Sequence, residues 1–143
     1  MKVSDLMSRE IVTLGRNESL DLADRIMALG RIRHMPVVDE DGQLCGIVSQ
    51  RDLFRGALAT ALGYGLVAQN KVLASMLVKD AMATELFTTT PDTPIGEAAH
   101  VMLQRKIGCL PVVEAGRLVG LITEADFVKH IAAANAPPDP RRE

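Results

Sequence analysis

The chain has 143 residues, of which 48% are apolar, and its formal net charge is −2. A chain of this length with this many apolar residues buries a core without staples, which excludes a disordered protein. The slightly negative charge argues against a protein that binds nucleic acid or a membrane surface through basic residues.

The sequence shows no feature of a secreted or membrane protein. The N-terminus lacks the apolar region of a signal peptide. The most apolar stretch, residues 56–68, is shorter than the ~18 residues that a membrane span needs, and glycines interrupt it. The two cysteines, Cys45 and Cys109, have no partner at disulfide or metal-ligand spacing, so we expect two buried, reduced thiols and no metal site. These features predict a cytoplasmic protein.

The first half of the chain has the pattern strand, helix, hairpin and helix. β-Prone runs alternate with apolar positions at helical spacing, and a glycine closes the turn between the hairpin strands. In chain order, the predicted elements are strand 11–14, a helix with Leu20, Ala23, Ile26 and Met27 on one face, strand 35–38, a turn at 39–42, strand 44–48 and a helix that begins near Asp52.

The second half has the same pattern. Thr93 is the predicted N-cap of its first helix, with Pro94 at the first helical position. The predicted elements are strand 86–89, a helix with Ile95, Ala98, Ala99 and Met102 on one face, strand 110–113, a turn at 114–116, strand 118–122 and a helix that begins near Asp126.

The two halves are also similar residue by residue. Residues 3–7 (VSDLM) return as 78–82 (VKDAM), and the PVV run at 36–38 returns at 111–113 with the same offset. So many matches in one register predict a tandem repeat.

The repeat predicts an α+β fold in which two β-α-β-β-α repeats pack about a pseudo-two-fold axis. A single repeat of about 55 residues is too small to cover both faces of its sheet. The predicted divisions are residues 1–62 for the first repeat, 63–76 for an inter-repeat linker with a helix, 77–134 for the second repeat and 135–143 for a disordered tail.

Each repeat closes with a motif of glycine, two strand residues, a hydroxyl residue, two variable residues and aspartate. The hydroxyl residues, Ser49 and Thr123, fall at a strand-to-helix junction, where backbone N–H groups favour an anion such as phosphate. The carboxylates of Asp52 and Asp126, one turn later, could accept hydrogen bonds from both hydroxyls of a ribose. The same spacing is close to a helix capping box, and the two roles can coexist.

The whole chain except its tail resembles a pair of CBS domains, the module named after cystathionine β-synthase. The resemblance rests on the Asp-x-Met segments at 5–7 and 80–82, on the Pro-Val-Val strands and on the Gly-x-x-Ser/Thr-x-x-Asp motifs. It implies adenosine-containing ligands, AMP, ADP or ATP, with S-adenosylmethionine or NAD as alternatives, bound in two clefts between the repeats.

The resemblance also implies roles for individual residues. Carried over by position, Asp52 and Asp126 hold ribose hydroxyls, and Ser49 and Thr123 contact phosphate or ribose. For His34, the alternative to a contact with the base is packing at the start of a strand. The implied contacts to the adenine edge, through backbone, are Val12, Thr13, His34, Met35, Pro36, Phe87, Thr88, Cys109, Leu110 and Pro111.

Four basic residues, Arg31, Arg33, Arg51 and Lys106, are candidates for phosphate contacts, with solvated charges at helix ends as the alternative. The first repeat holds the three arginines, whereas the second repeat has only the lysine. We therefore expect the site where the three arginines converge to prefer ligands that carry more phosphate charge.

The chain carries no motif of a catalytic site. It contains no GxSxG, no HExxH and no P-loop lysine motif, and Asp52 and Asp126 are equivalents rather than an acid and a base. We expect a regulatory nucleotide-binding module that is not an enzyme, needs no catalytic cofactor and acts on an unknown partner protein in trans. The alternative is a scaffold without a physiological nucleotide. Apolar helical faces, including Phe127 and Ile131, predict a homodimer in either case.

Overall fold

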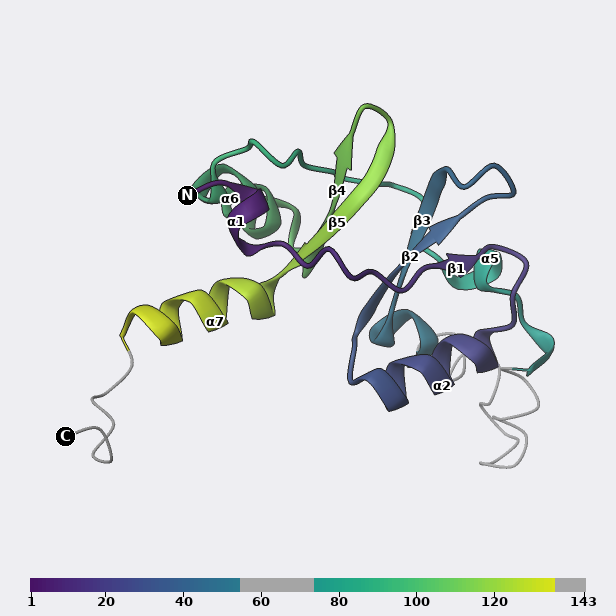
Figure 1. Ribbon diagram of the computed structural model, residues 1–143. Helices are drawn as coiled ribbons and strands as arrows, with labels where there is room; N and C mark the ends of the chain where they lie inside the picture. The colour runs from purple at the N-terminus through teal and green to yellow at the C-terminus, as the bar shows by residue number, and fades with distance from the viewer. Residues whose placement is uncertain (55–73, 136–143) are drawn as a thin grey trace. The chain divides into compact units, whose positions relative to one another are not determined.

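The computed structural model describes residues 1–54 and 74–135. The apolar stretch at 56–68, residues 63–73 of the predicted linker and the predicted tail after residue 135 lie outside these residues. Figure 1 shows the elements: α1 (Val3–Leu6), β1 (Leu14–Gly15), α2 (Leu20–Gly30), β2 (His34–Val38), β3 (Leu44–Ser49), α5 (Val78–Ala81), α6 (Ile95–Arg105), β4 (Cys109–Glu114), β5 (Arg117–Thr123) and α7 (Glu124–Ala134).

The described residues form two compact units. The β1–β3 unit holds residues 11–54, 74–87 and 116–118, and the β4–β5 unit holds residues 1–10, 88–115 and 119–135. The predicted α+β fold with two repeats is confirmed, because each unit combines helices with one of two similar hairpins.

The sheet of the β1–β3 unit has the strand order β1-β2-β3. β1 runs parallel to β2, and β2 and β3 form the predicted antiparallel hairpin, in which His34 lies opposite Ser49. The turn of the hairpin is held by the Asp39 carboxylate, which accepts hydrogen bonds from the backbone N–H groups of Asp41 and Gln43. Gly42 follows at a φ of 77°, a conformation that glycine adopts without steric cost.

The core of the β1–β3 unit is apolar and draws on every element of the unit. α2 begins at its N-cap Ser19, whose Oγ accepts a hydrogen bond from the Leu22 N–H. Val78 of α5 belongs to this core, although residues 78–82 open the second repeat by sequence. The buried residues of the core are Leu14, Leu20, Ala23, Met27, Met35, Val37, Val48, Leu53 and Val78.

In the β4–β5 unit, α6 buries Ala98 and Met102, and the helix contacts β4. The predicted N-cap at Thr93 is wrong by one position, because Pro94 is the N-cap and α6 begins at Ile95. The Thr93 hydroxyl lies 2.7 Å from the hydroxyl of Thr90 and so closes a turn before the helix instead of capping it.

The first strand of each repeat is shorter than predicted. Of the strand predicted at 11–14, only Leu14 pairs with β2, and Gly15 extends the pairing by one residue beyond the prediction. In the second repeat, Thr89 alone forms a parallel bridge, with Val112. Its N–H donates to Pro111 O at 2.9 Å. Both runs have high β-propensity, but the number of residues that form a strand depends on how many of them find a partner in the sheet.

The units exchange the segments that open the repeats, residues 3–8 and 78–83, which we call the leading segments. The segment 3–8 packs in the β4–β5 unit, where Val3 N–H donates to Thr93 O at 2.8 Å. The segment 78–83 packs in the β1–β3 unit, where Val78 N–H donates to Glu18 O at 2.7 Å. Repeats in sequence and units in space therefore differ in this element.

No helix in the described part of the chain is both long enough and apolar enough to span a bilayer.

Candidate functional site

The first candidate site is the junction where β3 ends at Ser49 and helical residues begin at Gln50. The Oδ2 atom of Asp52 accepts hydrogen bonds from the Ser49 N–H and from the Ser49 hydroxyl, both at 2.8 Å. The Asp52 N–H donates to Ser49 Oγ at 3.1 Å. The capping-box role of this pair is therefore real.

The second candidate site is the junction between β5 and α7, and it repeats this geometry. The Oδ2 atom of Asp126 accepts from the Thr123 N–H at 2.8 Å and from the Thr123 hydroxyl at 3.3 Å. Within the described part of the chain, Oδ1 of Asp52 and Oδ1 of Asp126 take part in no hydrogen bond. Each carboxylate thus caps a helix with its Oδ2 atom, and its Oδ1 atom can accept a hydrogen bond from a further donor.

Backbone contacts fix both junctions beside the start of the preceding strand. The Gln50 N–H donates to Arg33 O at 2.8 Å, and the Glu124 N–H donates to Gly108 O at 3.0 Å. In the first hairpin, His34 lies opposite Ser49. The β1–β3 unit therefore brings Arg33, His34, Ser49 and Asp52 to one end of its hairpin. The β4–β5 unit brings Gly108, Cys109, Thr123 and Asp126 together in the same way.

The predicted adenine contacts divide by burial. Met35, Pro36, Leu110 and Pro111 are fully buried in the strands, so they present almost no surface to a ligand. Cys109 is 5% exposed. The remaining predicted contacts are accessible: Val12, Thr13 and Thr88 are exposed, and His34 and Phe87 are half-buried.

The four basic candidates are exposed, and none of them forms an ion pair with another described residue. Arg31 and Lys106 occupy equivalent positions at the ends of α2 and α6, with left-handed φ angles of 53° and 55°. A non-glycine residue pays about 1 kcal/mol for this conformation. A basic side chain there also complements the helix dipole, so the structural role of both residues stays open beside a phosphate role.

The CBS domain model matches residues 3–59 and 78–133. The chain belongs to the CBS domain family. A CBS domain-containing protein of Dictyostelium discoideum is 31% identical over 97% of both chains. An uncharacterized protein of Methanocaldococcus jannaschii is 28% identical over 89% of this chain, and this chain spans only 41% of it.

Two solved CBS structures are similar to more than nine-tenths of the chain. The CBS domain pair of protein MJ0100, in complex with 5′-methylthioadenosine and S-adenosyl-L-methionine, has a TM-score of 0.76 and 30% identity, covering 94% of this chain and 98% of that one. CBSX2, in complex with AMP, has a TM-score of 0.75 and 26% identity, covering 93% and 97%.

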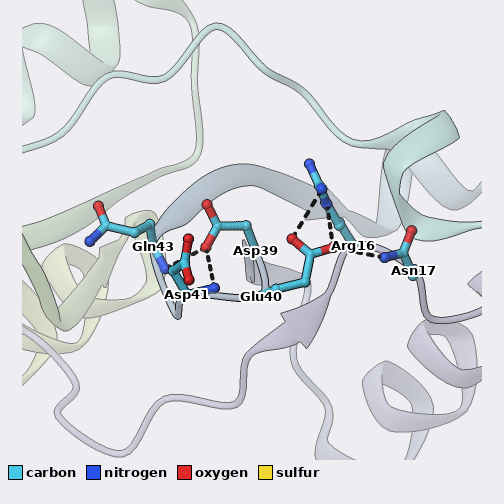
Figure 2. Close-up of polar contacts among 6 residues, drawn as sticks. All are labelled: Arg16, Asn17, Asp39, Glu40, Asp41 and Gln43. Atoms are coloured by element: carbon cyan, nitrogen blue, oxygen red, sulfur yellow. Dashed lines mark hydrogen bonds and ion pairs between the residues drawn. The ribbon is translucent and has the colours of Figure 1, made fainter.

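A polar cluster that the sequence did not predict lies at the other end of β2 in the first CBS repeat (Figure 2). The Arg16 guanidinium contacts both oxygens of Glu40, at 3.0 and 3.1 Å, and Asn17 donates to Glu40 at 3.1 Å. Hydrogen bonds from the backbone and from Arg16 lower the pKa of the Glu40 carboxyl. A hollow of about 220 Å³ lies beside the cluster. Since these side chains bind one another, the cluster ties the β1–α2 loop to the hairpin turn.

The cysteines and acidic residues of the described CBS repeats form no metal centre. No group of three or more His, Cys, Asp or Glu side chains is placed to hold an ion there. Neither cysteine forms a disulfide; Cys109 is buried as predicted, whereas Cys45 is only half-buried. Burial raises the pKa of the Cys45 thiol, and the carboxylates of Asp39 and Glu40 act in the same direction. A raised pKa keeps this thiol protonated and unreactive.

Proposed function

We propose that this CBS pair is a regulatory module that binds adenosine-containing ligands such as AMP, ADP or ATP in clefts between the two repeats. The observation that carries the proposal is that the capping hydrogen bonds at both junctions use only the Oδ2 atom of Asp52 and Asp126, so that Oδ1 can accept a hydrogen bond from a ligand. The module is not an enzyme, and it acts on a partner protein in trans.

The chemistry of the junctions suits a nucleoside. A carboxylate oxygen accepts hydrogen bonds from ribose hydroxyls, and a charged acceptor makes these bonds stronger than neutral ones. The N–H groups at the start of α7, beside Thr123, favour a phosphate or another anion. Val12, Thr13 and Thr88 are exposed residues, and their backbone N–H and C=O groups are the donors and acceptors proposed to meet the edge of a base. The solved relatives that bind AMP and S-adenosyl-L-methionine support the same ligand class.

The test of this function is a set of thermal melts with millimolar AMP, ADP, ATP, NAD and S-adenosylmethionine. A ligand that binds only the folded state at a hundredfold excess over its Kd adds about 2.7 kcal/mol of stability, so at least one of the five is expected to raise the Tm. If none raises it, the chain is the scaffold without a physiological nucleotide. The nucleotides are expected to be recovered intact after long incubation, and steady hydrolysis lost in Asp52→Asn would contradict a non-catalytic role.

The first repeat is proposed to prefer ligands with more phosphate charge. Its three arginines, Arg31, Arg33 and Arg51, stand where the second repeat has only Lys106. We expect Arg33→Ala to weaken ATP binding about fivefold, since one exposed charge contact contributes about 1 kcal/mol, and to change AMP binding less. Titration calorimetry with both nucleotides measures the two affinities.

Arg25→Ala is the control for this prediction, because it removes one arginine from α2 at a position where its partner is Asp21. This variant should bind both nucleotides like the natural sequence. Equal losses for ATP and AMP in Arg33→Ala would show that phosphate charge is not what Arg33 recognises.

A homodimer is part of the proposal. None of the α7 residues is buried, and Val128 and Ile131 are 64% and 61% exposed. An apolar helical face of this kind favours association with a second copy. We also propose a cytoplasmic location, where free nucleotides and reduced thiols occur together. Native mass spectrometry of the purified protein reports the subunit count and any retained ligand.

A further inference from the structure

The glycine of the first junction motif, Gly46 in β3, is covered by a methionine from the leading segment 78–83. A Cβ atom placed on Gly46 would lie 2.5 Å from the sulfur of Met82 and 2.9 Å from its Cγ. Real Cβ atoms essentially never approach other atoms this closely, so any side chain at position 46 displaces Met82. Both residues belong to the β1–β3 unit.

The second motif shows the same arrangement in the β4–β5 unit. A Cβ atom on Gly120 in β5 would lie 2.6 Å from the sulfur of Met7 and 3.2 Å from its Cγ. Met7 comes from the leading segment 3–8 and is only 9% exposed. The arrangement therefore occurs twice, once in each unit, between equivalent residues of the repeats.

Backbone hydrogen bonds hold each methionine against its glycine. Ile47 and Ala83 exchange two bonds, of 3.0 and 2.8 Å, and Leu121 and Ser8 exchange two, of 3.0 and 2.9 Å. The residue after each methionine thus pairs with the residue after each glycine, as in an antiparallel ladder. The carbonyl oxygen of Ala83 lies 3.1 Å from the Cβ position of Gly46, a tight contact that a shift of a few tenths of an ångström relieves, so Met82 is the main obstacle to a side chain there.

Strand β3 connects Gly46 directly to the Ser49–Asp52 junction. Ile47 pairs with Ala83, Val48 is fully buried in the core, and Ser49 follows with its bonds to Asp52. Since close-packed cores transmit strain, we expect a shift at Gly46 to pass through the packed Val48 and to move the Ser49 N–H relative to the Asp52 carboxylate. A methionine that only filled space would not need a glycine beneath it, since a larger residue at 46 and a smaller one at 82 would fill the same volume.

We propose that Met82 and Met7 are positioning residues, which set the Ser49–Asp52 and Thr123–Asp126 junctions through Gly46 and Gly120. Each junction is thereby positioned by the leading segment that opens the other repeat. The consequence for ligand affinity rests on the proposed nucleotide function, whereas the positioning of the junction does not.

The experiment compares Gly46→Ala with the double variant Gly46→Ala/Met82→Ala, under conditions where circular dichroism shows both to be folded. Gly46→Ala is expected to weaken AMP binding about tenfold and to speed hydrogen exchange of the Ser49 amide about tenfold. The double variant removes the clashing side chain and should recover most of both effects. Gly96→Ala is the control, because a Cβ atom there meets nothing within 4 Å, and it should change neither measurement.

Met82→Ala and Met82→Leu test the same contact if Gly46→Ala does not fold. Met82→Ala leaves a gap over Gly46 and should also speed Ser49 exchange, while the similar volume of leucine in Met82→Leu should restore slow exchange.

The inference is overturned if Gly46→Ala leaves Ser49 exchange unchanged, or if the second substitution rescues nothing. If the natural protein fails to bind AMP and the other adenosine ligands while Ser49 exchange still responds and is rescued, the nucleotide function fails and the positioning role stands. If the natural protein binds AMP and Gly46→Ala binds it equally well, the positioning role fails alone.

Discussion

Replacing Val78 by aspartate is expected to destabilise the β1–β3 unit severely, although residue 78 opens the second repeat by sequence. The Val78 side chain is 0% exposed and belongs to the core formed by β1, α2, β2 and β3. A buried carboxylate without a partner is among the few changes that cost about 4 kcal/mol or more, a large part of the 5–15 kcal/mol by which a domain is stable. Urea unfolding gives the loss, and hydrogen exchange shows where protection disappears.

The neighbouring substitution Lys79→Asp is the control, because Lys79 is exposed and should tolerate the same new charge. The reciprocal substitution, Val3→Asp, should remove protection from α6, β4 and β5, since Val3 is fully buried in the β4–β5 unit. If Val78→Asp instead exposed β4 and β5 and spared β1–β3, the exchange of leading segments would be wrong.

Asp52→Asn is expected to weaken AMP binding by about ten- to hundredfold, while the protein stays folded. Asparagine can still accept the hydrogen bond of the Ser49 N–H through its carbonyl oxygen, so the cap largely survives. Its NH₂ group, however, donates where Oδ1 would accept from a ribose hydroxyl. Loss of a hydrogen bond to a charged group costs about 1.5–3 kcal/mol. Calorimetry measures the affinity, and a thermal melt without ligand measures the cap.

Asp126→Asn makes the same change at the second junction, so the two variants separate the contributions of two sites. Asp41→Asn, in the exposed hairpin turn, removes a carboxylate where no ligand contact is proposed. Unchanged AMP binding in the double variant Asp52→Asn/Asp126→Asn would restrict both aspartates to helix capping.

The sequence predicted the two junctions because their signals are local. A hydroxyl residue and an aspartate three residues later determine a capping box wherever a strand leads into a helix, and Ser49–Asp52 and Thr123–Asp126 both form one. The hairpins followed for the same reason, since Asp39 and Gly42 define the first turn within a few residues. The identity of the ligand depends on more than the junctions, so it stays a proposal.

The exchange of leading segments could not be predicted in this way. Matching Val3 with Val78 shows that the segments are equivalent, but equivalence says nothing about which hairpin each one covers. That choice depends on contacts between residues far apart in the chain, such as Ile47 with Ala83 and Ser8 with Leu121. The role of Met7 and Met82 could not be predicted either, because nothing local in the sequence connects either residue with the glycine beneath it.

The exchanged segments have a consequence for any attempt to divide this protein. A break between the repeats would leave one fragment with an uncovered edge of β3 and a spare α1, and the other with an uncovered edge of β5 and a spare α5. Each fragment then carries the missing piece of its counterpart, so co-expressed halves should reassemble by complementation, whereas either half alone would present an open strand edge prone to aggregation.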